Sequence, residues 1–325
     1  MLLPDIDPSP QIVTFGETLL RHTASAGARL ERARKLELTV GGAESNVATA
    51  AAALGCRGVW LSKLPDGRLA DIVLADLRSR GVEPVVARGD GRVGCYYVEP
   101  AGEPRGWQVE YDRAATSIRT ARPEELALDR VRAADVFYIS GITPALSSRL
   151  AETSGRLLDI ARGAGVKTAV DVNYRSKLWD PTDASQALVP ILERADTIVV
   201  ASRDAATLYD LDGPSSEIAQ AIRERFGPEC VIVTDGEAGA TAWRDGETVV
   251  TPSVPTETHD PIGSGDAFVG GFLAADQLGH SLETALRVAS FLAAWCRTLS
   301  GDAIEIDREE IRAGIEPSAD GSVGR

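Results

Sequence analysis

Apolar residues recur along most of the chain in two alternating patterns. Short runs rich in valine and isoleucine predict strands at residues 11–15, 58–62, 82–87, 136–140, 166–172, 197–200 and 230–234. Apolar positions at helical spacing predict helices at residues 44–54, 68–80, 146–162, 184–194 and 216–226. Strands that alternate with helices in this way join through right-handed crossovers. The pattern therefore predicts an α/β fold with a central, mostly parallel sheet that helices cover on both faces.

Two stretches break this alternation. Residues 18–40 and 92–113 alternate apolar and polar positions without a helical period, which is typical of antiparallel strands outside the main sheet. Such strands would form a small lid over the carboxyl ends of the central sheet, where open α/β folds bind ligands. We expect one domain over residues 1–315 and a flexible tail at 316–325, which is rich in Gly, Ser and Asp.

Charge narrows the class of protein. The 325 residues include 34 Lys or Arg against 48 Asp or Glu, which gives a net charge of −14. Nucleic acids and anionic membranes need a basic footprint, so neither is expected as a partner. No apolar run approaches the roughly 18 residues of a membrane span, and the N-terminus lacks a basic-then-apolar run, so we expect a cytoplasmic protein. An acidic chain with only four lysines also resembles proteins of halophilic cytoplasm, where solubility must survive high salt.

The strongest candidate for chemistry is HDPIGSGDAFVGGF at residues 259–272. Its glycine-rich first half predicts a turn, and its apolar second half predicts a helix that runs to about residue 278. The backbone N–H groups of residues 263–266 would then lie unpaired at a helix N-terminus, where they and the helix dipole can bind a transferring phosphate. Asp266 lies beside that site and can accept a proton from an attacking hydroxyl. The candidate catalytic residues are Gly263, Ser264, Gly265 and Asp266.

Other interpretations of this segment meet difficulties of spacing. The chain contains no G-x-x-x-x-G-K-[ST], which excludes a P-loop enzyme. A dinucleotide fingerprint needs a third glycine where this chain has Phe268, and it opens the first strand–helix unit of a domain. The remaining alternative is that Asp266 only stabilises the N-terminus of its helix and takes no part in chemistry.

The whole run resembles the C-terminal signature of the PfkB (ribokinase-like) family of carbohydrate kinases, usually written D-T-T-G-A-G-D. VGGAESNVA at residues 40–48 resembles that family's N-terminal signature, G-G-x-x-x-N-x-A, so the likeness spans about residues 12–305. This resemblance implies a ribokinase-like fold, Asp266 as the catalytic base, ATP as phosphate donor and Mg²⁺ as cofactor.

Several segments further resemble the 2-keto-3-deoxygluconate kinases of that family: GGAESNVA at 41–48, GCY at 94–96, YDR at 111–113, SGIT at 140–143 and DVNYRSKLW at 171–179. The likeness implies phosphorylation of 2-keto-3-deoxygluconate, or its galactonate epimer, to the 6-phosphate. The likeness also implies that the residues around the sugar are Gly42, Asn46, Tyr96, Tyr111, Arg113, Ile142, Arg175 and Asp302.

The two arginines support a sugar acid on physical grounds. Desolvating a carboxylate requires a fixed cation, and an arginine offers a bidentate fork. Arg113 lies in the expected lid and Arg175 follows the carboxyl end of a strand, so the two side chains could converge from opposite walls. The alternative is that both form surface salt bridges.

The segments expected to bind the nucleotide match the family pattern less closely than the segments expected to bind the sugar. VIVTDGEAGA at 231–240 resembles a strand and loop that border ATP in the family, which makes Thr234 and Gly236 candidate nucleotide contacts. Relatives usually carry N-x-x-E where this chain has VASRDAA at 200–206, with Ser202 and Ala205 at the two key positions. We keep Ser202 as a nucleotide contact and assign no metal ligand, although Asp204 could hold a magnesium-linked water.

Three interpretations therefore remain open. The first is a kinase for a sugar acid, and the second is a related kinase for a neutral sugar such as ribose or fructose. The third is a weakly active relative that binds sugar and nucleotide, which the altered 202–205 segment favours and the intact 263–266 run disfavours. If the lid strands present an apolar face, a homodimer through the lid is expected.

Overall fold

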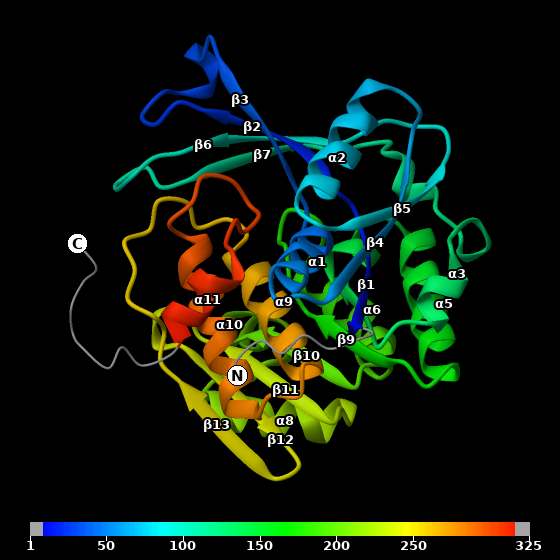
Figure 1. The fold of residues 1–325 in the computed structure, drawn as a ribbon, viewed down its shortest axis with the longest axis vertical. Helices are drawn as coiled ribbons and strands as arrows, with labels where there is room; N and C mark the ends of the chain where they lie inside the picture. Colours follow the sequence, from blue (N-terminus) through cyan, green and yellow to red (C-terminus); the bar gives the residue numbers. More distant parts are fainter. Residues whose placement is uncertain (1–8, 316–325) are drawn as a thin grey trace.

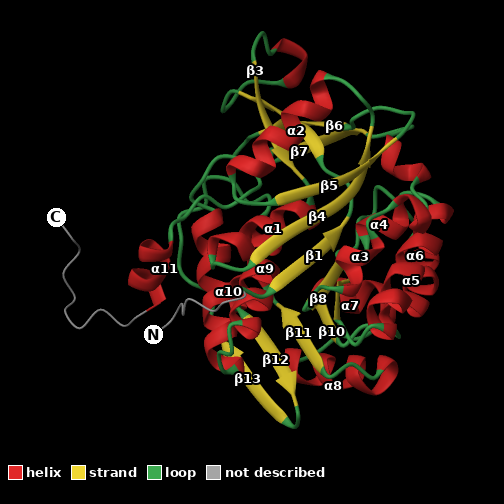
Figure 2. Cartoon of the chain, turned by 45° about the vertical axis from the view of Figure 1, so that its right-hand side comes forward, coloured by secondary structure: helices red, strands yellow, loops and turns green. Residues whose placement is uncertain are grey.

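The computed structural model describes residues 9–315, where nine strands form one sheet in the order β13-β12-β11-β10-β9-β8-β1-β4-β5 (Figures 1 and 2). The strands are β1 (Gln11–Phe15), β4 (Arg57–Leu64), β5 (Glu83–Arg88), β8 (Val136–Ser140), β9 (Lys167–Asp171), β10 (Thr197–Ala201), β11 (Cys230–Thr234), β12 (Ala240–Arg244) and β13 (Glu247–Thr251). The strands from β5 to β11 in this order pair in parallel, and only β12 and β13 at one edge pair antiparallel. The expected mostly parallel sheet is confirmed.

Helices cover both faces of this sheet. Neighbouring residues of β1 show the division, because Ile12 packs toward one helical layer and Val13 toward the other. The layer on the Ile12 side contains α1 (Ala43–Ala53), α9 (Ser264–Gln277), α10 (Leu282–Cys296) and α11 (Arg308–Ile315). The layer on the Val13 side contains α3 (Leu128–Arg132), α5 (Ser148–Gly163), α6 (Pro181–Leu192), α7 (Ser202–Tyr209) and α8 (Ser215–Phe226). The short helix α4 (Ile142–Ala145) follows β8, and α2 (Arg68–Ser79) packs on Trp60 of β4.

Helix boundaries follow local capping. The helix expected from residue 146 begins as α5 at Ser148, because the Ser147 hydroxyl accepts a 3.1 Å hydrogen bond from the Leu150 N–H and so caps the first turn. Similarly, α6 begins at Pro181 behind the cap Asp180, earlier than residue 184.

Four further strands form the lid, in the order β3-β2-β6-β7, drawn across the upper part of Figure 1. They are β2 (Leu19–Ala24), β3 (Leu36–Gly41), β6 (Cys95–Glu99) and β7 (Gln108–Asp112). Two pairs are antiparallel as expected, but β2 and β6 pair in parallel, so the expectation of wholly antiparallel strands is wrong at that pair. The reason is topological: β2 follows β1 and β6 follows β5, so both leave parallel strands of the main sheet in the same direction.

The expected tail at 316–325 lies outside the described residues. Among residues 9–315, no helix combines the length and the apolar character needed to cross a membrane.

Candidate active site

A cleft of about 830 Å³ lies between the lid and the carboxyl ends of the central strands. Its walls include every site residue expected from the sequence except Asn46, which lies directly behind one of them. The expected residues that line it are Gly42, Tyr96, Tyr111, Arg113, Ile142, Arg175, Ser202, Thr234, Gly236, Gly263, Ser264, Gly265, Asp266 and Asp302. One cleft therefore contains both glycine signatures, the two arginines and the candidate nucleotide contacts.

The turn before α9 has the geometry of an anion site. Gly263 caps the helix with a φ of 86°, a conformation that favours glycine, and its backbone packs so closely on Asp302 that a Cβ would lie 1.7 Å from the Asp302 carbonyl oxygen. The first helical hydrogen bond runs from the Ala267 N–H to the Gly263 carbonyl, 2.9 Å away. The N–H groups of residues 264–266 precede it, so they have no acceptor within the helix. A Cβ at Gly265 would have no neighbour within 4 Å, which leaves open space for a phosphate.

Asp266 lies in the first turn of α9 and is buried. The side-chain amide of Asn46 on α1 donates a 2.8 Å hydrogen bond to its carboxylate. Burial raises the pKa of Asp266 to about 7, although the Asn46 hydrogen bond and the positive charge of Arg175 oppose the increase. A carboxylate that titrates near neutral pH is well suited to accept a hydroxyl proton.

A second carboxylate lines the cleft, at Asp171 at the end of β9. Burial, together with the negative charges of Asp266 and Asp204, raises the pKa of Asp171 to about 8. Asp171 begins the segment 171–179 that resembles the 2-keto-3-deoxygluconate kinases, of which only Arg175 was predicted as a site residue. Its position at the carboxyl end of a buried strand, where open α/β folds bind ligands, could have identified it.

Lid residues form the wall of the cleft where the sequence predicts sugar contacts. The hydroxyl of Tyr96 donates a hydrogen bond to Asp302, and its ring stacks on Tyr111 at a centroid distance of 5.7 Å. Arg113 is bound by the Glu17 carboxylate, with Nε and Nη2 at 2.8 and 2.6 Å from Oε2, and its guanidinium lies 5.3 Å from the centre of the Tyr111 ring. Glu17 was missed because nothing in its local sequence separates it from any other residue after a strand.

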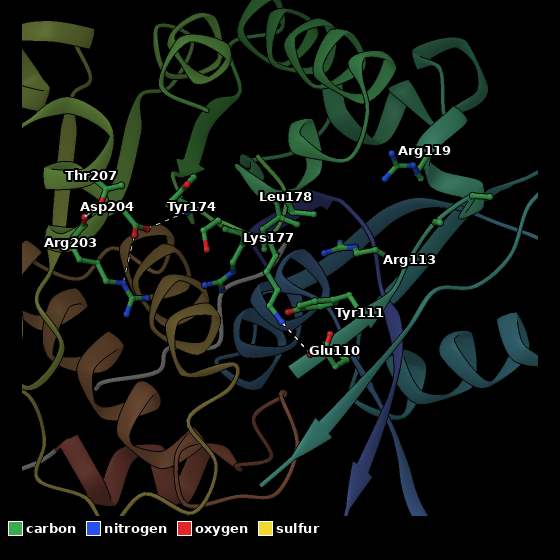
Figure 3. A pocket seen from close by; sticks show the side chains of 15 residues that line it. Glu110, Tyr111, Arg113, Arg119, Tyr174, Lys177, Leu178, Arg203, Asp204 and Thr207 are labelled. Carbon is green, nitrogen blue, oxygen red and sulfur yellow. Dashed lines mark hydrogen bonds and ion pairs between the residues drawn. The ribbon is translucent and has the colours of Figure 1, made fainter. Parts of the chain in front are cut away.

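Arg175 differs from Arg113 in its pairing. No carboxylate of the described residues lies within ion-pair distance of the Arg175 guanidinium, whereas Arg113 is paired with Glu17. The cleft continues past Arg175 into a hollow of about 750 Å³, whose basic lining residues are Arg113, Arg119, Arg175, Lys177 and Arg203 (Figure 3). Only Glu110 and Asp204 contribute carboxylates to that hollow. The mouth of the site is therefore basic, although the chain as a whole is acidic.

The N-terminal signature places Gly42 and Asn46 by close packing. A Cβ at Gly42 would lie 2.3 Å from the Glu17 carbonyl oxygen. Glu44 is buried in the wall of the cleft and accepts 2.7 Å hydrogen bonds from the hydroxyls of Ser140 and Thr143, which tie α1 to the end of β8 and to α4. The glutamate of this signature thus links three elements at the wall of the cleft, which composition and spacing did not indicate.

The nucleotide candidates gather at the other end of the cleft. Thr234 ends β11, and Gly236 follows with a φ of 54°. The Ser202 hydroxyl donates a 2.5 Å hydrogen bond to Asp235, which joins the loops after β10 and β11. Ser290 and Ala293 of α10 complete the wall.

The segment after β10 carries the positions where the sequence departs from the family pattern. Ala205 is buried in the apolar core, whereas the neighbouring Asp204 lines the cleft and accepts a 3.2 Å hydrogen bond from the Tyr174 N–H. Position 205 therefore supplies no acidic group, and the geometry suits the predicted role of Asp204 instead, because α7 begins at Ser202 and directs position 204 toward the cleft. Burial raises the pKa of Asp204, and Arg203 opposes that effect.

Comparisons with known proteins agree with this geometry. Residues 9–308 match the protein-family model described as pfkB family carbohydrate kinase. The chain is 48% identical over 302 residues to 2-dehydro-3-deoxygalactonokinase of Haloferax volcanii, covering 93% of this chain and 95% of that protein. It is 28% identical over 313 residues to Fructokinase-2 of Oryza sativa, covering 89% of each. The fold matches the crystal structure of 2-dehydro-3-deoxygluconokinase from Thermotoga maritima with a TM-score of 0.91 and 27% identity, over 95% of this chain and 99% of that one.

Proposed function

Because the chain belongs to the pfkB family of carbohydrate kinases, we propose that it transfers phosphate from ATP to the terminal hydroxyl of a 2-keto-3-deoxy sugar acid, giving the 6-phosphate. The galactonate epimer is the first candidate, since the relative at 48% identity is named for it, and the gluconate epimer is the second. We assign the reaction to the cytoplasm, where ATP is available.

One observation carries the choice of a sugar acid: Arg113 and Arg175 line the same cleft as Asp266. A desolvated carboxylate is stable only beside a fixed positive charge, and a neutral sugar requires none. Arg175 forms no direct ion pair among the described residues, so a ligand carboxylate could bind it without displacing one, although its charge also acts on Asp266. The basic mouth formed with Arg119, Lys177 and Arg203 would favour the entry of an anion.

Each group of residues in the cleft has its own role in the transfer. The N–H groups at the start of α9 hold the phosphate that is transferred, and their fixed orientation stabilises the charge that develops on it. Asp266 accepts the proton of the attacking hydroxyl, and Asn46 holds that carboxylate in place. The lid strands exclude water, so that the sugar hydroxyl rather than water attacks.

The residues also fit magnesium bound with the nucleotide. Mg²⁺ is usually held by one or two carboxylates together with phosphates and waters. Asp204 supplies such a carboxylate beside Ser202, and no cage of three or more ligating His, Cys, Asp or Glu side chains occurs in residues 9–315. Asp204 would hold the ion through water, and the ion would neutralise charge on the phosphates.

A comparison of acceptors tests the proposal. ADP release is measured with 2-keto-3-deoxygalactonate, 2-keto-3-deoxygluconate, ribose and fructose at several salt concentrations. The kcat/KM for a sugar acid should exceed that for either neutral sugar by roughly 10²-fold or more, because one charged contact contributes up to about 3 kcal/mol. A preference for ribose or fructose would replace the sugar acid with a neutral substrate. No ADP release with any acceptor would favour a binding protein of low activity.

We also propose that two copies associate through the lid. Leu36 and Leu38 lie on one face of the edge strand β3 and are 38% and 43% exposed. Analytical ultracentrifugation should detect a dimer, and Leu36→Glu combined with Leu38→Glu should yield a monomer. A monomeric wild-type protein at micromolar concentration would contradict this proposal.

A further inference from the structure

Arg21 of the lid strand β2 connects the lid to both loops that shape the anion site. Its Nη2 binds Asp260 Oδ2, its Nη1 binds Asp302 Oδ1, and its Nε donates a 2.9 Å hydrogen bond to the Thr23 hydroxyl. The arginine side chain is 1% exposed, and the two carboxylates are 3% and 7% exposed. The two terminal nitrogens of one guanidinium therefore bridge segments that lie far apart in the sequence, while Nε anchors the side chain to its own strand.

Each carboxylate that Arg21 binds also fixes backbone of the site. Asp260 accepts hydrogen bonds from the N–H groups of Ile262 (3.0 Å) and Gly301 (3.2 Å), which hold the turn that leads to Gly263. Asp302 accepts the Tyr96 hydroxyl, and its own carbonyl packs against Gly263. The position of the phosphate-binding turn thus depends on two carboxylates that a lid residue holds.

The bridge depends on the positive charge of Arg21. Burial lowers the pKa of the Arg21 guanidinium, but Asp302, Tyr96 and Asp260 outweigh burial and leave that pKa above its usual value, so Arg21 stays charged. If the lid strand moved away, Asp260 and Asp302 would lose the cation that they share, and the two negative charges would repel each other. The closed lid and the formed turn must therefore stabilise each other.

We propose that Arg21 is a positioning residue that couples closure of the lid to formation of the phosphate-binding turn at residues 260–266. Binding of the sugar under the lid then also orders the N–H groups that hold the phosphate, so the transfer site is completed only when the acceptor is present. The inference rests on phosphotransfer at the start of α9 and is independent of which sugar is bound.

A second arginine that forms an ion pair away from the cleft provides a control for effects on stability alone. Arg244 of β12 forms a 2.6 Å ion pair with Asp276, at the opposite end of the same helix α9, and lines neither the cleft nor the lid. Arg21→Lys keeps a charge but loses the planar fork whose two terminal nitrogens each bind one carboxylate, and Arg244→Lys makes the same change away from the site. If Arg21→Lys folds poorly, a double variant that combines Arg21→Met with Asp260→Asn is used instead. This double variant removes one cation and one carboxylate together, so it leaves the net charge of the cluster unchanged.

Kinetics give the first test, at a salt concentration where circular dichroism shows both variants folded. A misplaced site commonly costs about 10²-fold, so Arg21→Lys should lower kcat by roughly 10- to 100-fold, whereas Arg244→Lys should stay within about threefold of wild type. Equal kcat losses in the two variants, or an unchanged kcat in Arg21→Lys, would show that the bridge only stabilises the fold.

Hydrogen–deuterium exchange tests the coupling itself. In the wild type, the sugar acid should slow amide exchange in both β6 and the turn at 260–266. In Arg21→Lys, the same sugar should protect β6 but not the turn. Protection of both segments in the variant would overturn the proposal, while the wild-type kinase activity would remain as a separate result.

Discussion

The side-chain amide of Asn46 lies 2.8 Å from the carboxylate of Asp266, across 220 positions of sequence. This contact requires α1 and α9 to pack closely, and a Cβ at Gly270 would lie 2.5 Å from the Val47 carbonyl oxygen. Gly270, in the second half of the C-terminal signature, therefore allows α1 and α9 to pack closely. This packing places Asn46 of the N-terminal signature against Asp266 of the C-terminal signature.

Replacing Asp266 removes the proton acceptor. Asp266→Asn keeps the size of the side chain and can still bind Asn46, so kcat should fall by about 10²-fold or more while sugar and ATP still bind. Asp276→Asn, on the same helix and outside the cleft, is the control and should keep its turnover. Retention of most of the kcat in Asp266→Asn would remove its assignment as the base.

The ionisation of Asp266 should set the acid side of the pH profile. Its pKa of about 7 is raised by burial, so the proton-accepting form is lost as the pH falls through 7, and kcat/KM should fall with it. Asn46→Ala removes a hydrogen bond that lowers this pKa, so the acid limb should move to higher pH and part of the lost activity should return in alkaline buffer. A limb that stays in place in Asn46→Ala would contradict the contact's role.

Much of this fold follows from local sequence, because Val- and Ile-rich runs and helical periods identify the parallel strands and their covering helices. The turn before α9 could also be predicted locally, because its glycines directly precede an apolar helical run and Gly263 adopts the positive φ that favours glycine. Arg21 could not be found in this way, because its role depends on Asp260 and Asp302, which lie 239 and 281 positions away. The orientation of Asp204 likewise depends on where α7 begins, which the sequence pattern did not fix.

Salt should stabilise the folded chain. A net charge of −14 creates repulsion among surface carboxylates, and ions screen it because the Debye length falls from about 10 Å at 0.1 M to about 3 Å at 1 M. The Tm, followed by circular dichroism in KCl, should therefore rise strongly between these concentrations. A flat or falling Tm would leave the likeness to halophilic proteins without support.

The most direct test of the sugar-acid assignment is the selectivity of Arg175→Gln. Arg175 is a cleaner target than Arg113, whose removal would leave Glu17 buried and unpaired. Because Arg175 also lowers the pKa of Asp266, the assay is run well above pH 7, where that carboxylate is ionised in both proteins.

In this assay, kcat/KM for the sugar acid should fall by roughly 10- to 100-fold, since a charged contact contributes about 1.5–3 kcal/mol, and Arg175→Lys should recover little of it. The weak activity on a neutral sugar of similar length should barely change. Equal losses on both substrates, or full activity on the sugar acid, would contradict recognition of the carboxylate by Arg175.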